Sequence, residues 1–296
     1  LGAFICTACL ANTVHQVSSY GITWEFDHPV ESGTFLTGDP WVIGPVKVVS
    51  ITNTLNSAEF TPRMGQNGSM VNPLTNATPE NRGEQGYDDG ISTYNPQLNA
   101  GRPNGQPVSL ENPLSIPTGS SLISSVSWLY RSNDDKEVGC PTISTSSGCP
   151  RPAIRAASIL TILASPPPAH SFRPPYSGAD KTVHFSLQDV NWEQLKDFPR
   201  PANSPDPDQL IAALKRPWID HAFEWLGAMI HPSTHMPNYG RDMGNLIVDA
   251  SLLINTDIPA EKKRELTAYL IQYGIDLTGI ADNGGGWRAN GGHSLG

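Results

Sequence analysis

Along this chain the spacing of apolar residues changes once, from a period of two to a period near 3.6. Ile22, Trp24 and Phe26 alternate with polar residues, as in a strand that buries one face. From residue 242 to 255 apolar residues instead recur three and four positions apart, as on one face of a helix. The change predicts two structural units, the first built from strands and the second from helices.

The first unit is expected to span residues 18–166. Its other short strands are expected at residues 33–35, 41–51, 121–130 and 154–163. Residues 61–120 are dense in Asn, Pro and Gly, so we expect a long insertion there rather than a series of strands. Many short strands joined by long Gly/Pro loops favour an antiparallel β-sandwich.

A Pro-rich stretch separates the two units, and residues 167–188 are expected to form an extended, semi-rigid linker. Helix signals follow in residues 189–296. Long helices are expected from about Pro217, over 242–255 and after Asp257, and short ones near 189–195 and 207–214. Helices on short connections pack as antiparallel hairpins, which gives an α+β chain of two domains.

The last of these helices is defined in most detail. Asp257 is a plausible N-cap, with Pro259 in the first turn. Either Gly274 or Gly279 is expected to end the helix. Its buried stripe is predicted to contain Leu266, Tyr269, Leu270 and Tyr273.

Charge and composition narrow the function classes. The chain of 296 residues has 19 Lys and Arg against 28 Asp and Glu, a net charge of −9, which argues against a protein that follows nucleic-acid phosphates. A hydrophobic share of 38% with seven Trp argues against disorder. Low charge with 27 Gly and 27 Pro is common in exported proteins.

The two ends of the chain also suggest export, and a fragment. Residues 1–11 are apolar and end in small residues, so residues 1–17 are interpreted as the remnant of a secretion signal, too short to span a membrane. A buried first strand and an acylation site at Cys9 are the alternatives. Because the chain begins at Leu1 and stops in a Gly-rich stretch at Gly296, we expect residues to be missing at both ends.

Cysteine use fits an extracellular or periplasmic location. Cys140 and Cys149 would remain after removal of the signal, and a disulfide between them would contribute roughly 2–3 kcal/mol. Two free thiols are the alternative. Neither cysteine has a CxxC partner, so no metal and no cofactor are expected.

Residues 218–242 contain the first group of candidate site residues. The acid–base and charge-neutralising candidates are His221, His235, Tyr239 and Arg241, and the substrate-binding candidates are Glu224 and Asn238. Tyr or His can move a proton from a sugar ring while Arg or Asn neutralises a uronate carboxylate. The carboxylates of Asp220, Glu224 and Asp242 would instead suit a glycosidase. In the alternative interpretation these residues have no role in a site and simply form the polar start of a helix.

The final loop contains a second group of candidates. Trp287, Arg288 and His293 lie among glycines, where the indole could stack on a sugar ring and the guanidinium could bind an acidic group. Ser294 lies in a G-x-S-x-G pattern, which would suit a serine esterase.

With a β-rich half, a Pro spacer and helical hairpins in this order, residues 18–296 resemble secreted bacterial carbohydrate-active enzymes. The resemblance implies an N-terminal antiparallel β-sandwich followed by a partial (α/α) toroid. It also implies a polysaccharide lyase or glycoside hydrolase that acts on an extracellular polysaccharide or oligosaccharide. The alternatives are a non-catalytic secreted glycan-binding or surface protein and, less favoured, the serine esterase.

Overall fold

The computed structural model describes residues 12–54, 66–72, 100, 106–127, 154–215 and 240–282. The strands in this part are β1 Asn12–Ser19, β2 Ile22–Thr34, β3 Pro40–Ile43, β4 Val46–Asn53, β5 Gln66–Val71, β6 Leu114–Ile116, β7 Ser120–Ser127 and β8 Ile154–Leu163. The helices are α1 Pro207–Leu214, α2 Gly240–Leu253 and α3 Ala260–Asp282, with 3-10 turns η3 Leu187–Asp189 and η4 Trp192–Gln194.

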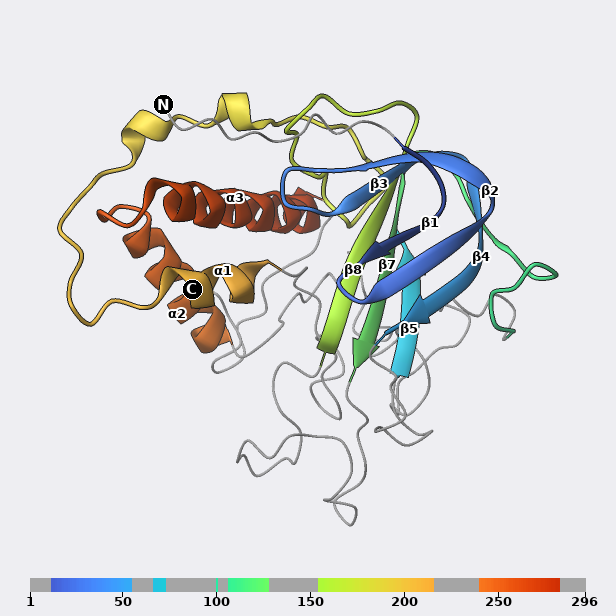
Figure 1. Cartoon of the computed structure of the whole chain (residues 1–296), viewed down its shortest axis with the longest axis horizontal. Helices are drawn as coiled ribbons and strands as arrows, with labels where there is room; N and C mark the ends of the chain where they lie inside the picture. Colours follow the sequence, from blue (N-terminus) through green and yellow to red (C-terminus); the bar gives the residue numbers. More distant parts are fainter. Residues whose placement is uncertain are drawn as a thin grey trace, which may run out of the picture.

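All eight strands of the described residues belong to one sheet. Its order is β5-β7-β8-β3-β2-β4-β6, with β1 paired to β2 outside this path. The described pairings are antiparallel, except that β3 and β8 run parallel. Trp24 on β2 donates from Nε1 to the Ser124 hydroxyl on β7 at 2.9 Å, although these strands are not neighbours in the sheet. The sheet therefore curves back on itself into a nearly closed, barrel-like structure (Figure 1).

The predicted β-sandwich is thus wrong. Inward-facing side chains from six strands share one core, which contains Ile22, Trp24, Phe26, Val30, Val42, Val46, Val48, Ile116, Leu122, Leu160 and Ile162. A sandwich and a barrel bury the same alternate residues of each strand and differ in which strands pair. Periodicity located the strands but carried no information on that pairing.

Several strand predictions are confirmed, and one is wrong. Ile22, Trp24 and Phe26 are buried along β2 as expected, and β7 and β8 match the predicted strands at 121–130 and 154–163. Within residues 61–120, however, β5 and β6 take part in the sheet. Both are short and lie in polar sequence, so their apolar alternation is too weak to identify them.

The three helices pack together beside the sheet. They share a core that contains Leu210, Ile211, Leu214, Ala250, Leu253, Ile258, Leu266 and Tyr269. The predicted short helix at 207–214 and the amphipathic helix at 242–255 correspond to α1 and α2. The predicted (α/α) toroid is wrong, because the helices of the described residues form one small cluster against a mostly β structure.

Helix α3 is longer than expected. It runs through both Gly274 and Gly279 to Asp282. At Gly279 the absence of a side chain has a packing cause, because an added Cβ would lie 2.2 Å from the Cβ of Pro175. No heavy atom lies within 4 Å of a Cβ built on Gly274. The glycine at 279 therefore allows close approach rather than ending the helix.

A fully buried arginine fixes α3 against the sheet. Arg173, in the segment predicted as a linker, is 1% exposed. It donates from Nε to Asp39 Oδ2 at 3.1 Å, and from Nη1 and Nη2 to the two Asp276 oxygens at 2.8 and 2.6 Å. Asp39 lies in the turn between β2 and β3, and Asp276 lies on α3. We call these three residues the Arg173 junction.

The backbone around Arg173 is held by the same helix. Gln272 accepts from the Arg173 N–H at 2.9 Å and donates to its carbonyl at 3.1 Å. Lys181 is also buried, and its ammonium donates to the carbonyls of residues 175–178 at 2.7–3.2 Å. Residues 171–181 are thus a packed connection between the sheet and α3.

Candidate functional site

Nearly all the site residues predicted from the sequence lie outside the described residues. These are His221, Glu224, His235, Asn238, Tyr239, Trp287, Arg288, His293 and Ser294. The backbone of Arg241 lies in the first turn of α2. The four cysteines also lie outside, and no disulfide occurs in the described part, so the predicted Cys140–Cys149 bond has no support there.

Two pockets are lined by residues of α3 and of the segment that runs from β8 to α1. This segment is yellow in Figure 1. The larger has a volume of about 650 Å³, and we call it the Trp192 pocket. It is lined by Leu36, Thr37, His170, Leu187, Gln188, Trp192, Glu261, Arg264, Glu265, Ala268 and Tyr269. Its volume is in the range of small-molecule sites.

Helix periodicity brings the charged groups of this pocket together. Glu261, Arg264, Glu265 and Ala268 are spaced i, i+3, i+4 and i+7, so they share one face of α3. Ala268, at the C-terminal end of this row, is buried. The floor is thus a short row of two carboxylates and one guanidinium.

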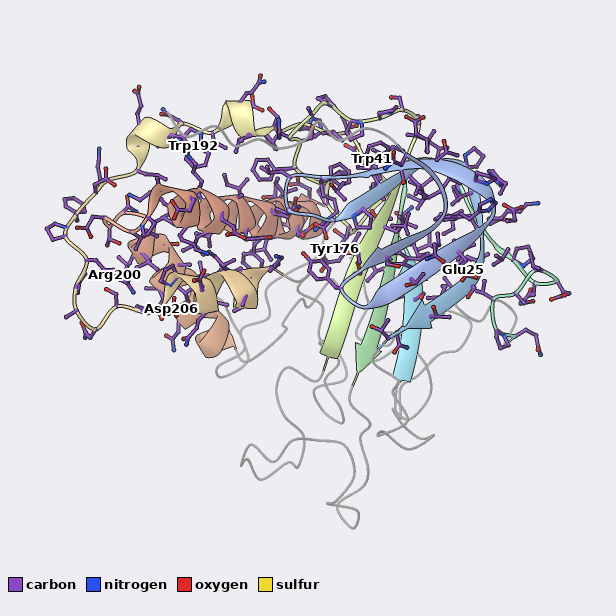
Figure 2. All side chains as sticks on the ribbon, viewed as in Figure 1. Glu25, Trp41, Tyr176, Trp192, Arg200 and Asp206 are labelled. Carbon is purple, nitrogen blue, oxygen red and sulfur yellow. The ribbon has the colours of Figure 1, made fainter. Side chains whose placement is uncertain are left out.

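Trp192 lies over this row from the opposite wall. Its 3-10 turn is capped by Asn191, whose side chain accepts from the Glu193 N–H at 3.2 Å. The Arg264 guanidinium carbon lies 5.9 Å from the centre of the half-buried Trp192 ring, within reach of a cation–π contact. Figure 2 shows Trp192 above α3. An aromatic wall and a charged floor therefore face each other.

A second capped turn positions the remaining polar wall. Ser186 is the N-cap of η3, and its backbone N–H and hydroxyl donate to Asp189 Oδ2 at 2.7 and 2.8 Å. These capping contacts stabilise the turn, and Gln188 in this turn lines the pocket. At the floor, burial and the nearby Glu265 carboxylate raise the pKa of Tyr269 to about 12, so its phenol stays protonated at neutral pH.

A short ribbon lies between this pocket and the smaller one. Ser171 and Ser186 form an antiparallel bridge, with Phe172 N–H donating to the Phe185 carbonyl at 2.9 Å. On one side of the ribbon, His170 and Leu187 line the Trp192 pocket. On the other side, Phe172 and Phe185 line the second.

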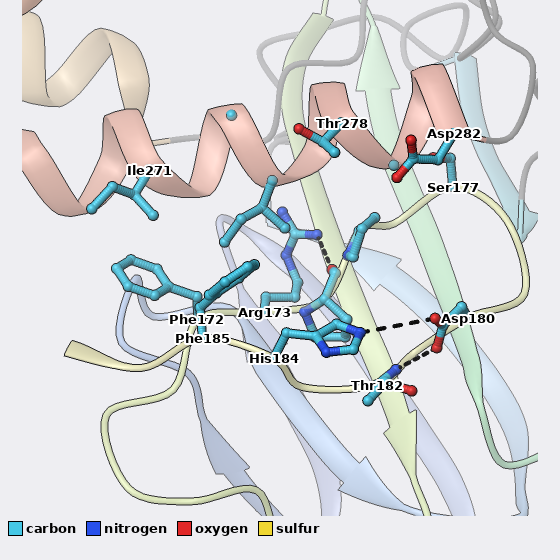
Figure 3. Close-up of a pocket in the computed structure, with 15 residues that line it drawn as sticks. Phe172, Arg173, Ser177, Asp180, Thr182, His184, Phe185, Ile271, Thr278 and Asp282 are labelled. Atoms are coloured by element: carbon cyan, nitrogen blue, oxygen red, sulfur yellow. Dashed lines mark hydrogen bonds and ion pairs between the residues drawn. The ribbon is translucent and has the colours of Figure 1, made fainter. Parts of the chain in front are cut away.

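The second pocket, of about 540 Å³, is mostly apolar (Figure 3). His184 and Asp180 approach to 4.0 Å at its rim, and Asp180 also accepts from the Thr182 N–H at 2.9 Å. The buried Ser177 hydroxyl has no hydrogen-bond partner among the described residues. Because Ser177 and His184 lie at different ends of the pocket in Figure 3, they do not form a nucleophile–base pair.

The described residues show neither a metal-binding cluster nor a membrane-spanning helix. They contain no group of three or more His, Cys, Asp or Glu side chains placed to hold a metal ion. Among the helices of these same residues, none has the length and apolar character needed to cross a membrane.

Comparison of the chain with protein-family models, with curated proteins and with solved structures found no significant match. The resemblance to carbohydrate-active enzymes therefore gains no support from these comparisons.

The Trp192 pocket was not anticipated from the sequence. Its members come from the β2–β3 turn, the connecting segment and α3, so no local motif contains them. A partial signal was present, because Glu261, Arg264 and Glu265 have the spacing of one helix face. Their aromatic partner lies some 70 residues away in the sequence and is brought close only by the tertiary structure.

Proposed function

We propose that this chain is an exported glycan-binding protein and that its saccharide site is the Trp192 pocket. The observation that carries the proposal is a half-buried indole that lines a pocket together with a row of carboxylate and guanidinium groups. Export is the part of the proposal that rests on the apolar N-terminal run and on the composition of the chain.

Saccharides present two kinds of surface, and the pocket offers a partner for each. The C–H face of a sugar ring is apolar and stacks on an aromatic side chain such as Trp192. Sugar hydroxyls both donate and accept hydrogen bonds. Glu261 and Glu265 supply acceptors, Arg264 supplies donors, and Gln188 supplies both. A purely apolar ligand would leave these polar groups without partners.

The paired carboxylates favour a second candidate, a glycoside hydrolase. Two carboxyl groups that flank a glycosidic bond can act as the acid and the base of hydrolysis. Glu261 and Glu265 are one helical turn apart in the same pocket. Hydrolysis of a bound oligosaccharide, lost in both E261Q and E265Q, would establish this candidate.

Titration calorimetry against a panel of neutral, amino and acidic oligosaccharides tests the binding proposal. We expect at least one oligosaccharide to bind, and Trp192→Ala to weaken that binding about fivefold or more, taking as the scale the roughly 1–3 kcal/mol of a nucleobase stacked on an aromatic side chain.

The matched control is Phe198→Ala, because Phe198 is 62% exposed and does not line the pocket. Affinity should be unchanged in this variant. Equal weakening in both variants, or no binding of any member of the panel, would overturn the proposal.

A further inference from the structure

The charge of the Trp192 pocket distinguishes between classes of saccharide. Glu261 and Glu265 contribute two negative charges and Arg264 one positive charge, so the formally charged lining residues leave one net negative charge. His170 also lines the pocket. Tyr269 stays protonated, because burial and the Glu265 carboxylate raise its pKa to about 12.

The lysines next to this row do not compensate for that charge. Lys262 pairs with Asp208 on α1, and Lys263 pairs with Asp197 and also donates to the Lys196 carbonyl at 2.7 Å. Neither lysine lines the pocket. Both ammonium groups are thus paired outside the pocket, and the charged side chains that line the pocket are those of the Glu-Arg-Glu row.

Arg264 does not provide an isolated site for an acidic sugar. Its guanidinium is engaged over the Trp192 ring and lies on the same helix face as both glutamates. A uronate carboxylate that reached Arg264 would therefore meet two like charges within one helical turn. An ammonium group would instead find two carboxylates of opposite charge.

We infer that the Trp192 pocket selects amino sugars and neutral sugars over uronates, with cationic glucosamine-type units bound best. This inference rests on the proposed saccharide site and names its ligand class. One unit charge at about 5 Å in water contributes roughly 0.8 kcal/mol, so each class should differ from the next by about fourfold.

Calorimetry with three tetrasaccharides measures this selectivity: glucosamine, N-acetylglucosamine and galacturonate tetramers. At pH 7, where the glucosamine tetramer still carries positive charge, we expect affinity to fall in that order. The spread should narrow as salt is raised, because the pocket is open to solvent. Glu265→Gln and Glu261→Gln should each reduce the glucosamine preference about fourfold and leave the affinity for N-acetylglucosamine largely unchanged.

Glu25→Gln is the matched control, because Glu25 is exposed on β2, at the other end of the molecule from Trp192 in Figure 2. It changes the net charge equally and should leave the order intact. Galacturonate binding as tight as N-acetylglucosamine binding, or a glucosamine preference that survives both pocket substitutions, would overturn the selectivity alone. Absence of binding for all three tetramers would overturn the proposed function and this inference with it.

Discussion

Substitution of Arg173 by Met should be the most destabilising single change in the Arg173 junction. The substitution keeps much of the volume of the side chain but removes the three hydrogen bonds that the guanidinium donates to Asp39 and Asp276. Both carboxylates are nearly inaccessible, with side-chain exposures of 5% and 7%, so water cannot replace the guanidinium without opening the fold.

The expected cost follows from these contacts. Removing one partner of a buried ion pair costs about 3–5 kcal/mol, because an uncompensated charge is left behind. Here a single cation serves two carboxylates, so we expect the upper part of that range. With a urea dependence of roughly 1–3 kcal/mol per molar, the unfolding midpoint should fall by more than about 1 M.

Urea unfolding followed by circular dichroism measures this change. Arg200→Met is the matched control, because Arg200 is exposed and its guanidinium donates to the Pro205 carbonyl at 2.7 Å, while only its backbone N–H, which the substitution keeps, donates to the Asp257 carboxylate. The control should lose no more than about 0.5 kcal/mol. In a D39N/D276N background, Arg173→Met should cost less than in the parent chain, because no unpaired carboxylate remains. A loss below about 1 kcal/mol for Arg173→Met in the parent chain would refute this account of the junction.

Two further changes test the connection between the sheet and α3. Burial and the nearby Arg173 guanidinium lower the pKa of Lys181 to about 7, so between pH 7 and about 10 the unfolded chain binds a proton that the folded chain lacks. The free energy of unfolding should therefore rise by up to about 1.4 kcal/mol per pH unit in this window. Lys181→Met should remove that rise. If the free energy of unfolding of the variant rises with pH as steeply as that of the parent chain, Lys181 is not the group that titrates. Gly279→Ala should lower the midpoint of thermal unfolding, because its Cβ would meet Pro175 at 2.2 Å, and such overpacking costs typically about 1–3 kcal/mol. Gly274 lies in the same helix but faces open space, so Gly274→Ala should instead stabilise the protein by about 0.5–1 kcal/mol. Similar effects of the two substitutions on the unfolding midpoint would exclude the packing explanation.

The sequence predicted elements better than their arrangement. The burial of Ile22, Trp24 and Phe26 on one face of β2 follows from local alternation, and so does the strand at β8. The pairing of β8 with β3 joins residues more than 100 positions apart, and nothing local to either strand encodes it.

The same limit applies to the junction and the pocket. Arg173 lies in a Pro-rich stretch that reads as an exposed spacer, and its burial becomes intelligible only with Asp39 and Asp276 beside it. Trp192 was placed correctly in a short helical segment, while its relation to Arg264 depends on the path of the chain across α3. The periodicity of apolar residues cannot predict a site whose residues come from three segments that are distant in the sequence.

The position of β8 in the sheet has a consequence for how the chain is made. β8 lies between β7 and β3, so β5 and β7 are joined to β1–β4 only through β8, the last strand of the sheet among the described residues. Until residue 163 has emerged from the ribosome, β3 presents an unpaired edge with buried Trp41 and Val42 beside it. The nascent β1–β4 strands are therefore expected to remain aggregation-prone until β8, more than 100 residues downstream, has been made. Conditions that slow elongation through this interval should lengthen their exposure to chaperones.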